Sequence, residues 1–488
     1  MRICLINPLY GANSSISYSP PLGLAYIASS LEKNGHQIKI IDRVSLKYKD
    51  GEIGLGELDK KTEKEILNFE PNLIGIGAMT IQIYDTQRVA RLIRSIPGGK
   101  NYPLIAGGFH PTAEPELTLK ECPEIDAVCQ DEGELTMLKL ASGESYENVD
   151  GMTFKKNNQV LSTGEKCPIA DLDNLPVPAR HLLDMEFYTR LNEIVIPNVP
   201  ARVTTLITSR GCPFSCRFCA NKLIYKTVRF HSVKYTIDEI YSILENYKVE
   251  ALYFVDTEFL ANRKRIELLC HELIDRKLNK KFRWACSARV DSVNDKILKL
   301  MKKAGCFFIN YGFESGSQRM LDSMNKKTTV EQNSGAAMLT NKAHILVNSA
   351  FITNLPGENE DDLIATMQFI KNTKIYCTGL NNLLPLPGSP YYTELFKNGV
   401  LTYSDKLWEE IGALQSLDSI KIFSDMPKDR FIKLSRAINE MIARNNTKNY
   451  IRANWFRYPY RSAKRLLELI VLDLYHISGR ILPWKKKQ

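Results

Sequence analysis

The sequence lacks long hydrophobic runs and a secretion leader. No window of about 18 residues is uncharged and apolar throughout, although a membrane-spanning helix needs roughly that length. The apolar start, MRICLIN, has no basic segment before it and no small-residue cleavage site after it, so it is interpreted as a strand. These absences predict a cytoplasmic protein.

The sequence also lacks a disulfide-like cysteine pattern. The 488 residues contain eleven cysteines, an odd number, which are scattered except for one cluster. In a long chain without a secretion signal, this favours reduced thiols and one metal or catalytic site over a disulfide framework. The cluster lies in TSRGCPFSCRFCA (208–220), where Cys212, Cys216 and Cys219 have the spacing Cys-x3-Cys-x2-Cys.

A fourth cysteine is missing from this cluster. Three thiolates on one short loop can each hold one corner of an iron–sulfur cluster and leave one iron open for another molecule. Two other interpretations stay open at this point: a zinc site with His231 as fourth ligand, and a redox disulfide. Structural zinc sites more often use Cys-x2-Cys pairs, and a disulfide would leave one of the three thiols unpaired.

The first 145 residues alternate strand and helix signals. The segment 20–35 has a proline start, helical apolar spacing and a glycine stop. Such alternation predicts a parallel, doubly wound (Rossmann-like) sheet, whose ligands bind beyond the carboxyl ends of the strands. A hairpin at 151–163 and a proline-rich linker at 168–188 follow. The expected strands of the sheet are 2–7, 37–42, 72–77, 102–108 and 125–130.

A second strand–helix series begins just before the cysteine loop. It predicts a full or partial β/α (TIM-like) barrel, whose chemistry lies at the C-terminal ends of the strands. The expected strands are 202–209, 249–256, 282–289, 306–314, 345–353 and 379–386. The expected parts of this α/β chain are a doubly wound domain (1–145), a hairpin and linker (146–200), a barrel (201–400) and a helical basic C-terminal region (401–488).

The cysteine loop, with Phe218 just before its third cysteine, resembles the signature of the radical S-adenosylmethionine (radical SAM) superfamily. Further motifs resemble the subgroup that couples this barrel to a cobalamin-binding domain, the class B methyltransferase-like enzymes. Asn354 stands where such sequences usually have glycine, and Thr257 replaces a second acid. The motifs are FVDTEF (254–259), YGFESGSQRMLDSMNKKTT (311–329), FITNLPGENEDD (351–362) and PLPGSPYY (385–392), with PPLGLAYIASSL, AGGFHPTAEPE, DEGE and DLDNLPVPAR before them.

The resemblance implies that the three cysteines hold a four-iron four-sulfur (4Fe-4S) cluster whose open iron binds S-adenosylmethionine (SAM). One electron, from a donor such as flavodoxin or ferredoxin, would then release a 5′-deoxyadenosyl radical. The expected SAM-contacting residues are Phe218, Asp256, Glu258, Arg289 and Glu314. Two of them have an alternative interpretation: Glu314 could form an ordinary ion pair within the protein, and Arg289 could pair with Asp291 rather than with the SAM carboxylate.

The first domain lacks the Asp-x-His-x-x-Gly loop through which many corrinoid domains ligate cobalt. NPLYGA (7–12) stands there instead, but the subgroup commonly binds cobalamin without that histidine. Glycines would let a large flat cofactor approach the backbone, and His110 is either a cobalt ligand or a structural loop histidine. The alternative is a domain that has lost its cofactor and serves only docking. The expected cobalamin contacts are Thr80, Gly107, Gly108 and Glu132.

By resemblance, the expected reaction is cobalamin-dependent methylation of an unactivated carbon. Methylcobalamin would donate the methyl group, and a second SAM would remethylate the cobalt. A radical cyclase, oxidase or rearrangement enzyme with the same cofactors is the alternative, followed by a non-enzymatic metal- or corrinoid-binding module. The expected substrate is a small molecule or a lipid-linked one.

Positive charge is concentrated at the C-terminal end. The excess of lysine and arginine in 428–488 accounts for the whole net charge of +10. The segment 452–488 mixes arginines, aromatics and an apolar helical run, which suits either a helix docked on the barrel or a peripheral membrane anchor with Trp455, Trp484 and the lysines at 485–487. Nucleic-acid binding is disfavoured because no nucleic-acid-binding fold is evident.

Overall fold

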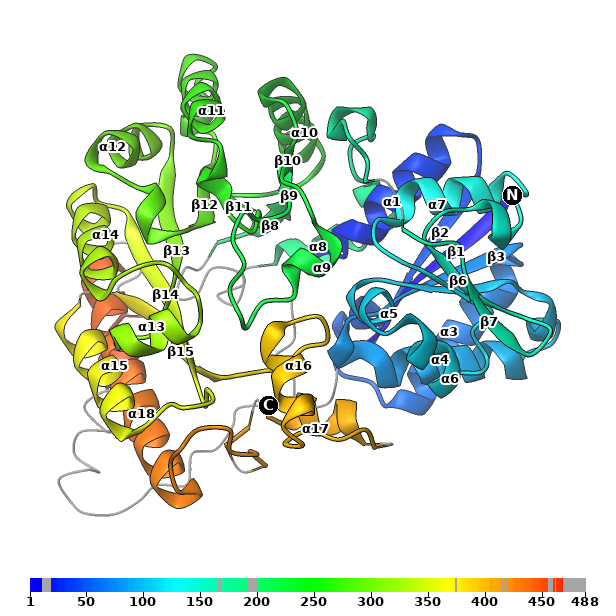
Figure 1. The fold of residues 1–488 in the computed structure, drawn as a ribbon. Coiled ribbons are helices and arrows are strands. Elements are labelled where there is room, and N and C mark those ends of the chain that lie inside the picture. The colour runs from blue at the N-terminus through cyan, green and yellow to red at the C-terminus, as the bar shows by residue number, and fades with distance from the viewer. Residues whose placement is uncertain are drawn as a thin grey trace.

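Two large sheets, each lined by helices, form the main part of the computed structural model (Figure 1). The first sheet, drawn in blue and cyan, lies beside the second, drawn in green and yellow. The structure describes residues 1–10, 19–165, 168–190, 201–373, 375–404, 406–414, 416–417, 419–454, 460 and 462–467.

The first sheet has the strand order β2-β1-β3-β4-β5-β6-β7. Its first five strands are parallel, whereas β6 and β7 pair in antiparallel fashion and extend the sheet as a hairpin. The order 2-1-3-4-5 is that of flavodoxin-like doubly wound domains, so the predicted fold is confirmed. The strands are β1 (Arg2–Asn7), β2 (Gln37–Asp42), β3 (Leu73–Gly77), β4 (Leu104–Gly107), β5 (Ala127–Cys129), β6 (Met152–Lys156) and β7 (Gln159–Ser162).

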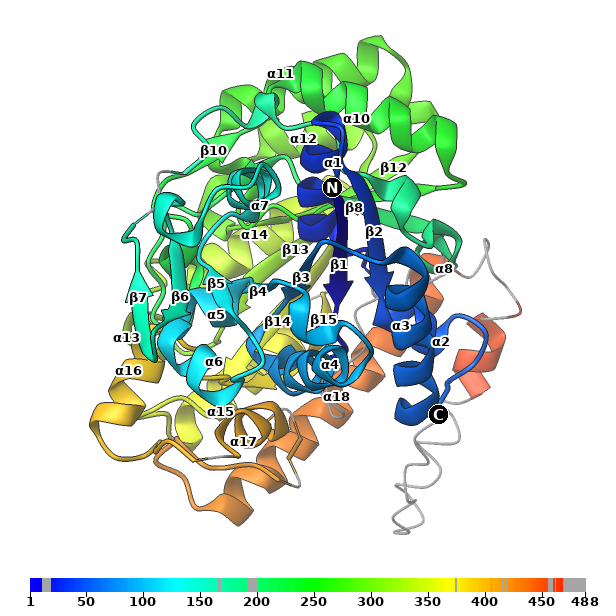
Figure 2. The same ribbon diagram turned by 90° about the vertical axis from the view of Figure 1, so that its right-hand side faces the viewer.

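Alternate residues of β1 show how this sheet is built. Ile3 and Leu5 pack on one face against α1 and α7, and Cys4 and Ile6 pack on the other face against α3, α4 and α6. This alternation is the two-residue period of a strand that is buried on both faces. Figure 2 shows these helices around the sheet. They are α1 (Leu22–Lys33), α3 (Leu55–Phe69), α4 (Ile83–Ser95), α6 (Pro115–Glu121) and α7 (Gly133–Ala141), with the shorter α2 (Arg43–Tyr48) and α5 (Phe109–Ala113) at the carboxyl ends of β2 and β4.

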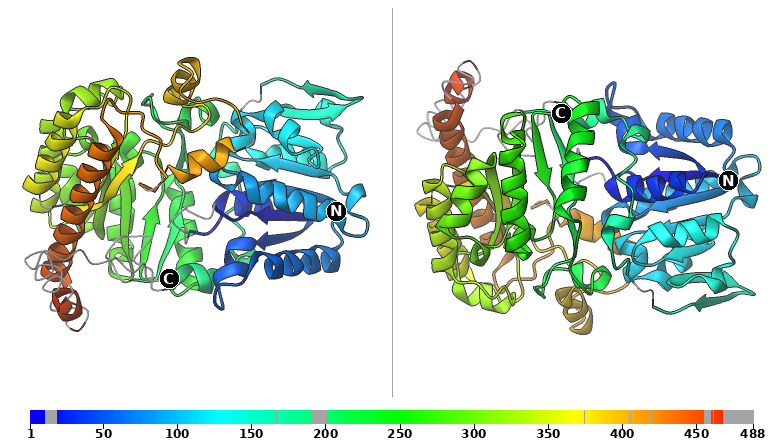
Figure 3. Two further views of the ribbon diagram at one scale, coloured as in Figure 1. Left: turned by 90° about the horizontal axis from the view of Figure 1, so that it is seen from below. Right: turned by 90° about the horizontal axis from the view of Figure 1, so that it is seen from above.

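The second sheet is a partial barrel. Its strands are all parallel in the order β15-β14-β13-β12-β11-β8, and β8 and β15 form its two edges. Figure 3 shows the helices of this half on its outer side. The strands are β8 (Val203–Leu206), β11 (Ala251–Phe254), β12 (Arg283–Ala288), β13 (Cys306–Glu314), β14 (Leu346–Thr353) and β15 (Tyr376–Asn382); the helices are α10 (Val233–Asn246), α11 (Arg263–Asp275), α12 (Asp295–Lys303), α14 (Val330–Lys342) and α15 (Glu360–Asn372).

The chain after the barrel returns to the first domain through α16 (Pro390–Lys397) and α17 (Leu407–Ala413). The Trp408 indole donates to Glu121 at 2.9 Å, and the Tyr392 hydroxyl donates to Glu114 at 2.9 Å. Both acceptors lie in or next to α6. These contacts fix the orientation of the first sheet relative to the barrel.

The last long helix, α18 (Lys428–Asn454), covers the open edge of the barrel. The Asn446 side chain accepts from the Cys377 N–H at 3.0 Å and donates to its carbonyl at 2.7 Å. Asn439 accepts from the Leu380 N–H, and Asn449 donates to the Ile375 carbonyl. Side-chain amides therefore take the place of a further strand and protect an edge that would otherwise remain unpaired.

We expect Asn446→Leu to destabilise the barrel by about 1–3 kcal/mol, because it leaves two edge backbone groups without their partners. The midpoint of urea unfolding measures this. Asn445→Leu is the matched control, since it makes the same change on the same helix where no bond to β15 is present. Equal midpoints for the two variants would show that the amide bonds contribute nothing to stability.

No helix in the described part of the chain is long and apolar enough to cross a membrane. Trp455, Trp484 and the lysines at 485–487, on which the predicted membrane anchor depends, lie outside the described residues.

Candidate active site

The cysteine loop lies at the C-terminal end of the first barrel strand. After β8, the two-residue strand β9 (Ser209–Arg210) pairs with β10 (Arg229–Phe230), and the loop runs between them. Gly211 begins the loop with a φ of 96°, and a Cβ there would collide with the Thr227 carbonyl oxygen. Only glycine fits this tight entry.

Distant segments hold the cysteine loop in place. The Arg217 N–H donates to the Met324 carbonyl at 2.9 Å, and the Arg217 carbonyl accepts from the Tyr391 N–H at 3.0 Å. The Asn325 amide donates to the Ser215 carbonyl at 2.9 Å. The loop is therefore fixed between the turn after α13 (Gln318–Ser323) and the start of α16.

The chemistry of the donor set fits an iron–sulfur cluster. Cys212, Cys216 and Cys219 are only partly buried, whereas the other described cysteines are buried. Burial raises the pKa of the Cys216 thiol, and the positive charges of Lys326 and Arg289 act against that rise. Cations beside thiols favour the thiolate form that ligates iron.

His231 is held by contacts of its own. Its Nδ1 is 3.2 Å from the Asp173 carboxylate, and its ring stacks between Tyr26 and Tyr235 at centroid distances of 6.2 and 3.9 Å. Within the described ranges, no three His, Cys, Asp or Glu side chains are placed to share one metal ion. The residues therefore do not support the zinc alternative.

The acids of FVDTEF are buried and bonded to the backbone around the site. Asp256 accepts from the Thr208 N–H at 3.1 Å and from the Ser209 hydroxyl, so it fixes the chain just before the cysteine loop. Glu258 accepts from the Arg289 N–H at 2.7 Å, and burial raises its pKa to about 7. In this structure both acids orient neighbouring strand ends.

Arg289 forms an ion pair with Asp291, the alternative to an ion pair with the SAM carboxylate. Its guanidinium donates two bonds of 2.9 Å to Asp291 and lies 3.6 Å from the centre of the Phe214 ring. Phe214 belongs to the cysteine loop, so Arg289 supports that loop. Its contact with SAM stays a prediction.

Glu314 pairs with a lysine that sequence reasoning missed. The Lys326 ammonium donates to Glu314 at 2.7 Å, both side chains are buried, and the ammonium lies 5.8 Å from the centre of the Phe218 ring. The signal was present, because Lys326 lies in the same quoted motif as Glu314. Glu314 has a φ of 61°, a left-handed conformation that costs energy in a non-glycine residue.

Asn354, the departure from glycine, takes the conformation that glycine would take. Its φ is 63°, and its amide accepts from the Phe423 N–H at 2.8 Å and donates to the Lys421 carbonyl at 2.8 Å. Asparagine tolerates this region better than most residues. The substitution keeps the turn and adds an attachment for the segment before α18.

We expect Gly312→Ala to weaken SAM binding by about tenfold or more, since a Cβ there would collide with Glu314 and lie 2.9 Å from Lys326 Nζ. Equilibrium binding of SAM to the reconstituted protein measures this. Gly335→Ala in α14 is the control, because a Cβ there meets nothing within 4 Å. Unchanged SAM affinity in the Gly312 variant would remove the Glu314–Lys326 pair from the SAM site.

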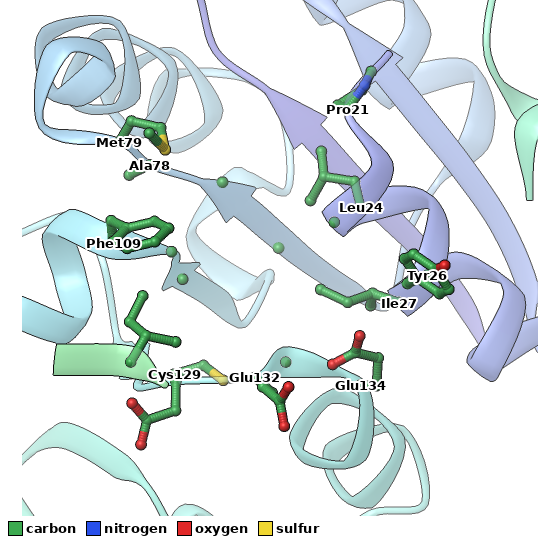
Figure 4. Close-up of a pocket in the computed structure, with 18 of the residues that line it drawn as sticks. Pro21, Leu24, Tyr26, Ile27, Ala78, Met79, Phe109, Cys129, Glu132 and Glu134 are labelled. Atoms are coloured by element: carbon green, nitrogen blue, oxygen red, sulfur yellow. The ribbon is translucent and has the colours of Figure 1, made fainter. Parts of the chain in front are cut away.

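A cavity of about 470 Å³ lies between the first sheet and the barrel mouth. Its lining includes Gly107, Gly108 and Glu132 from the first domain, and Gly211 and Thr257 from the barrel. Figure 4 shows Met79 and Phe109 at one side of it and Tyr26 and Ile27 at the other. The predicted cobalamin residues Gly107, Gly108 and Glu132 thus share a cavity with the start of the cysteine loop.

The lining of this cavity suits a large flat cofactor with an extended tail. A Cβ on Gly75 would lie 3.0 Å from Leu5 and 3.3 Å from Met137, so glycine keeps the apolar inner end open. Gly108 has a φ of 120°, and a Cβ there would lie 2.6 Å from the Ala78 carbonyl oxygen. Glycines therefore shape both the inner end and the rim.

Thr80 and His110 are buried and bonded to each other instead of contributing to the cavity lining. The Thr80 hydroxyl is 3.4 Å from His110 Nδ1, and the His110 ring packs edge-on against Trp408 at 4.6 Å. Burial lowers the pKa of His110 to about 4. The structure favours the interpretation of His110 as a structural histidine, and a Thr80 contact with cobalamin stays a prediction.

Glu132 joins the two halves of the molecule at this cavity. Arg210 Nη1 donates to Glu132 at 2.7 Å, Arg210 Nη2 donates to Glu134 at 2.6 Å, and Arg229 also pairs with Glu132 at 2.9 Å. The guanidinium of Arg210 lies 5.2 Å from the centre of the Tyr26 ring. All four charged side chains are buried, and Arg210 lies two residues before Cys212.

Comparisons with known proteins agree with this arrangement. The Radical SAM superfamily model matches residues 206–370, and the B12 binding domain model matches residues 12–141. An uncharacterized methyltransferase of Pyrococcus horikoshii is 32% identical over 410 residues, covering 83% of this chain and 84% of that protein. The anaerobic magnesium-protoporphyrin IX monomethyl ester cyclase of Rubrivivax gelatinosus is 28% identical over 411 residues, covering 81% of this chain and 70% of that one.

Solved structures show the same fold. The radical SAM methyltransferase TsrM of Kitasatospora setae aligns with a TM-score of 0.66 at 15% identity, covering 82% of this chain and 79% of that chain. The cobalamin-dependent radical enzyme OxsB aligns with a TM-score of 0.69 at 18% identity, covering 98% and 75%. The chain therefore belongs to the radical SAM superfamily, in the subgroup with a B12-binding domain, and is an enzyme whose cofactors are a 4Fe-4S cluster, SAM and cobalamin.

Proposed function

We propose that the enzyme transfers a methyl group from SAM, by way of cobalamin, to an unactivated carbon of a small molecule. The observation that carries this proposal is the single cavity shared by the carboxyl edge of the first sheet and the start of the cysteine loop. A radical and a methyl donor can act on the same carbon only if both are held close to it.

When bound, the cluster with SAM supplies a hydrogen-abstracting radical, and cobalamin supplies a transferable methyl group. Cys212, Cys216 and Cys219 would hold the cluster, with Lys326 and Arg289 as nearby positive charges. Gly107 and Gly108 would let the corrin approach the backbone at the cavity rim. Arg210 ties the start of the cysteine loop to Glu132 and Glu134, so the two cofactor sites keep one relative position.

The similarity to a protein named as a methyltransferase over most of both chains supports this reaction. A radical cyclase without methyl transfer is the second candidate, favoured by the 28% identity to the Rubrivivax gelatinosus cyclase. An external one-electron reductant, such as flavodoxin or ferredoxin, completes the proposal. The cytoplasm is the proposed location, because thiols stay reduced there.

Isotopic labelling distinguishes the two candidates. The reconstituted enzyme is incubated anaerobically with methyl-labelled SAM, a reductant and a small-molecule extract of the organism that carries the gene. Methyl transfer predicts a labelled product that the Cys216→Ala variant does not form. A product formed at the expense of SAM but without label would overturn methyl transfer in favour of the cyclase.

A further inference from the structure

Lys326 is a buried lysine beside the cysteine loop. Its side chain is 8% exposed, and its ammonium lies 5.8 Å from the centre of the Phe218 ring. Phe218 stands between Cys216 and Cys219 in the sequence, so this contact places the ammonium next to the part of the loop that carries these two thiols. Lysine is almost never buried in this way unless it is paired. The chain therefore keeps a cation at a place where burial is unfavourable for it.

Backbone hydrogen bonds hold Lys326 at this place. Its N–H donates to the Leu321 carbonyl at 3.0 Å, and its carbonyl accepts from the Arg289 guanidinium at 2.9 Å. Two residues earlier, the Met324 carbonyl accepts from the N–H of Arg217, a residue of the cysteine loop, at 2.9 Å. The position of the lysine relative to the loop is therefore fixed by the fold.

Lys326 keeps its positive charge although it is buried. Its ammonium donates to the Glu314 carboxylate at 2.7 Å. Burial opposes the charged form, but the negative charges of Glu314 and Cys216 outweigh that effect, so the pKa of Lys326 lies above its ordinary value. An ammonium with a raised pKa stays protonated at neutral pH. The site therefore holds a lasting positive charge with one negative charge beside it.

The ion pair presents its positive end to the cysteines. Burial raises the pKa of Cys216 and Cys219, the charge of Lys326 acts against that rise in both thiols, and the charge of Glu314 adds to it by less. Lys326 therefore has the larger electrostatic effect of the pair on this part of the loop. A negative charge placed on the cysteine site is stabilised by that orientation.

We propose that Lys326 raises the reduction potential of the cluster held by the cysteine loop, so that an external one-electron reductant can reduce it. Reduction transfers one electron from that reductant, of the flavodoxin or ferredoxin class, and adds one negative charge to a site that already has three thiolates; no proton moves. The potential of an iron–sulfur cluster depends on the charge around it. A buried cation acts more strongly than an exposed one, because water screens charge more than protein does. Glu314 limits the rise.

A redox titration followed by electron paramagnetic resonance tests the role of Lys326. The full-length enzyme is reconstituted anaerobically and titrated without SAM. We expect Lys326→Met to lower the ratio of reduced to oxidised cluster about tenfold at a fixed applied potential, which is a downward shift of about 59 mV for a one-electron couple. Lys326→Arg keeps the charge and should restore a potential close to that of the wild type.

The matched control is Lys327→Met. It removes the same charge from the adjacent residue, which is exposed, so the potential should stay that of the wild type. An unchanged potential in Lys326→Met, or an equal fall in Lys327→Met, would overturn the proposed role of Lys326.

Glu314→Gln tests the ion pair with the opposite sign. Without the carboxylate, the charge of Lys326 is no longer offset, so the potential should rise above that of the wild type. This variant decides the matter if Lys326→Met fails to assemble a cluster. An unchanged or lowered potential in Glu314→Gln would then overturn the inference.

The inference rests on the assignment of Cys212, Cys216 and Cys219 as cluster ligands, and it applies equally to methyl transfer and to cyclisation. A wild type that holds no iron would overturn the cluster site itself. A wild type that holds iron and labels its product, but whose potential responds to neither variant, would overturn the role of Lys326 alone. A potential that responds as expected, without any methyl label in a product, would overturn methyl transfer and leave the role of Lys326 in place.

Discussion

Replacing Cys212, Cys216 or Cys219 with alanine should remove most of the iron from the protein. The wild type, reconstituted anaerobically, is expected to hold about four irons and four sulfides per chain, and each variant well under half of that, because we predict these three thiolates to be the whole protein ligand set of the cluster. SAM cleavage should fall below detection in all three variants. Iron and sulfide analysis, together with the visible absorption spectrum, measures the first effect.

The matched control for this prediction is Cys270→Ala. Cys270 is buried in the core of the barrel half, and burial raises its pKa above the ordinary range of a thiol. It should remain protonated and inert, so its removal should leave the iron content unchanged. Full iron content in any of the three loop variants would mean that the cluster is held elsewhere.

Removing Arg210 should have the largest effect on stability. Its guanidinium pairs with Glu132 and Glu134, with side chains that are 8%, 4% and 4% exposed. Arg210→Gln leaves these buried carboxylates partly uncompensated, and breaking such a pair costs about 3–5 kcal/mol. The midpoint of urea unfolding should fall accordingly, and cobalamin retention should fall with it because Arg210 and Glu132 line the cavity.

An exposed ion pair provides the comparison for Arg210. Arg276 and Glu272 form an i, i+4 pair in and just after α11, with side chains 49% and 42% exposed. Arg276→Gln should therefore leave the midpoint of urea unfolding almost unchanged, because exposed ion pairs contribute little to stability. If Arg210→Gln proves too unstable to purify, Glu134→Gln removes a single carboxylate from the same network. A shift of the Arg210 variant no larger than that of Arg276→Gln would contradict a role for the network in joining the two domains.

Local sequence patterns predicted the architecture well. Buried strand runs that alternate with capped helices indicated both sheets, and the spacing of Cys212, Cys216 and Cys219 predicts a metal site on a loop that the structure places at a strand end. These features are readable because each depends on neighbouring residues. The comparisons and the strand order confirm the fold and the family.

Tertiary partners were harder to predict. Arg289 forms an ion pair with Asp291, and the sequence indicated this pair as an alternative because the two residues are only two positions apart. Lys326 lies twelve residues from Glu314 in the same motif, but the sequence does not show that the turn between them brings the two side chains into contact. The asparagines of α18 form hydrogen bonds with the edge of the barrel about 70 residues earlier in the chain. The helical periodicity of a sequence cannot show which distant strand a helix will contact.

The register of the barrel strands shows a further limit of sequence reasoning. Ser287, Asn310 and Asn348 come from three different strands, and each is unremarkable in its own segment. Only the pairing of the parallel strands brings these three residues to one level.

Formation of 5′-deoxyadenosine from SAM tests the central claim most directly. The anaerobically reconstituted chain, given SAM and a strong one-electron reductant, should release 5′-deoxyadenosine, and the Cys216→Ala protein should release none. A protein that holds its iron and binds SAM, yet leaves SAM uncleaved under these conditions, would contradict the account of this chain as a radical SAM enzyme.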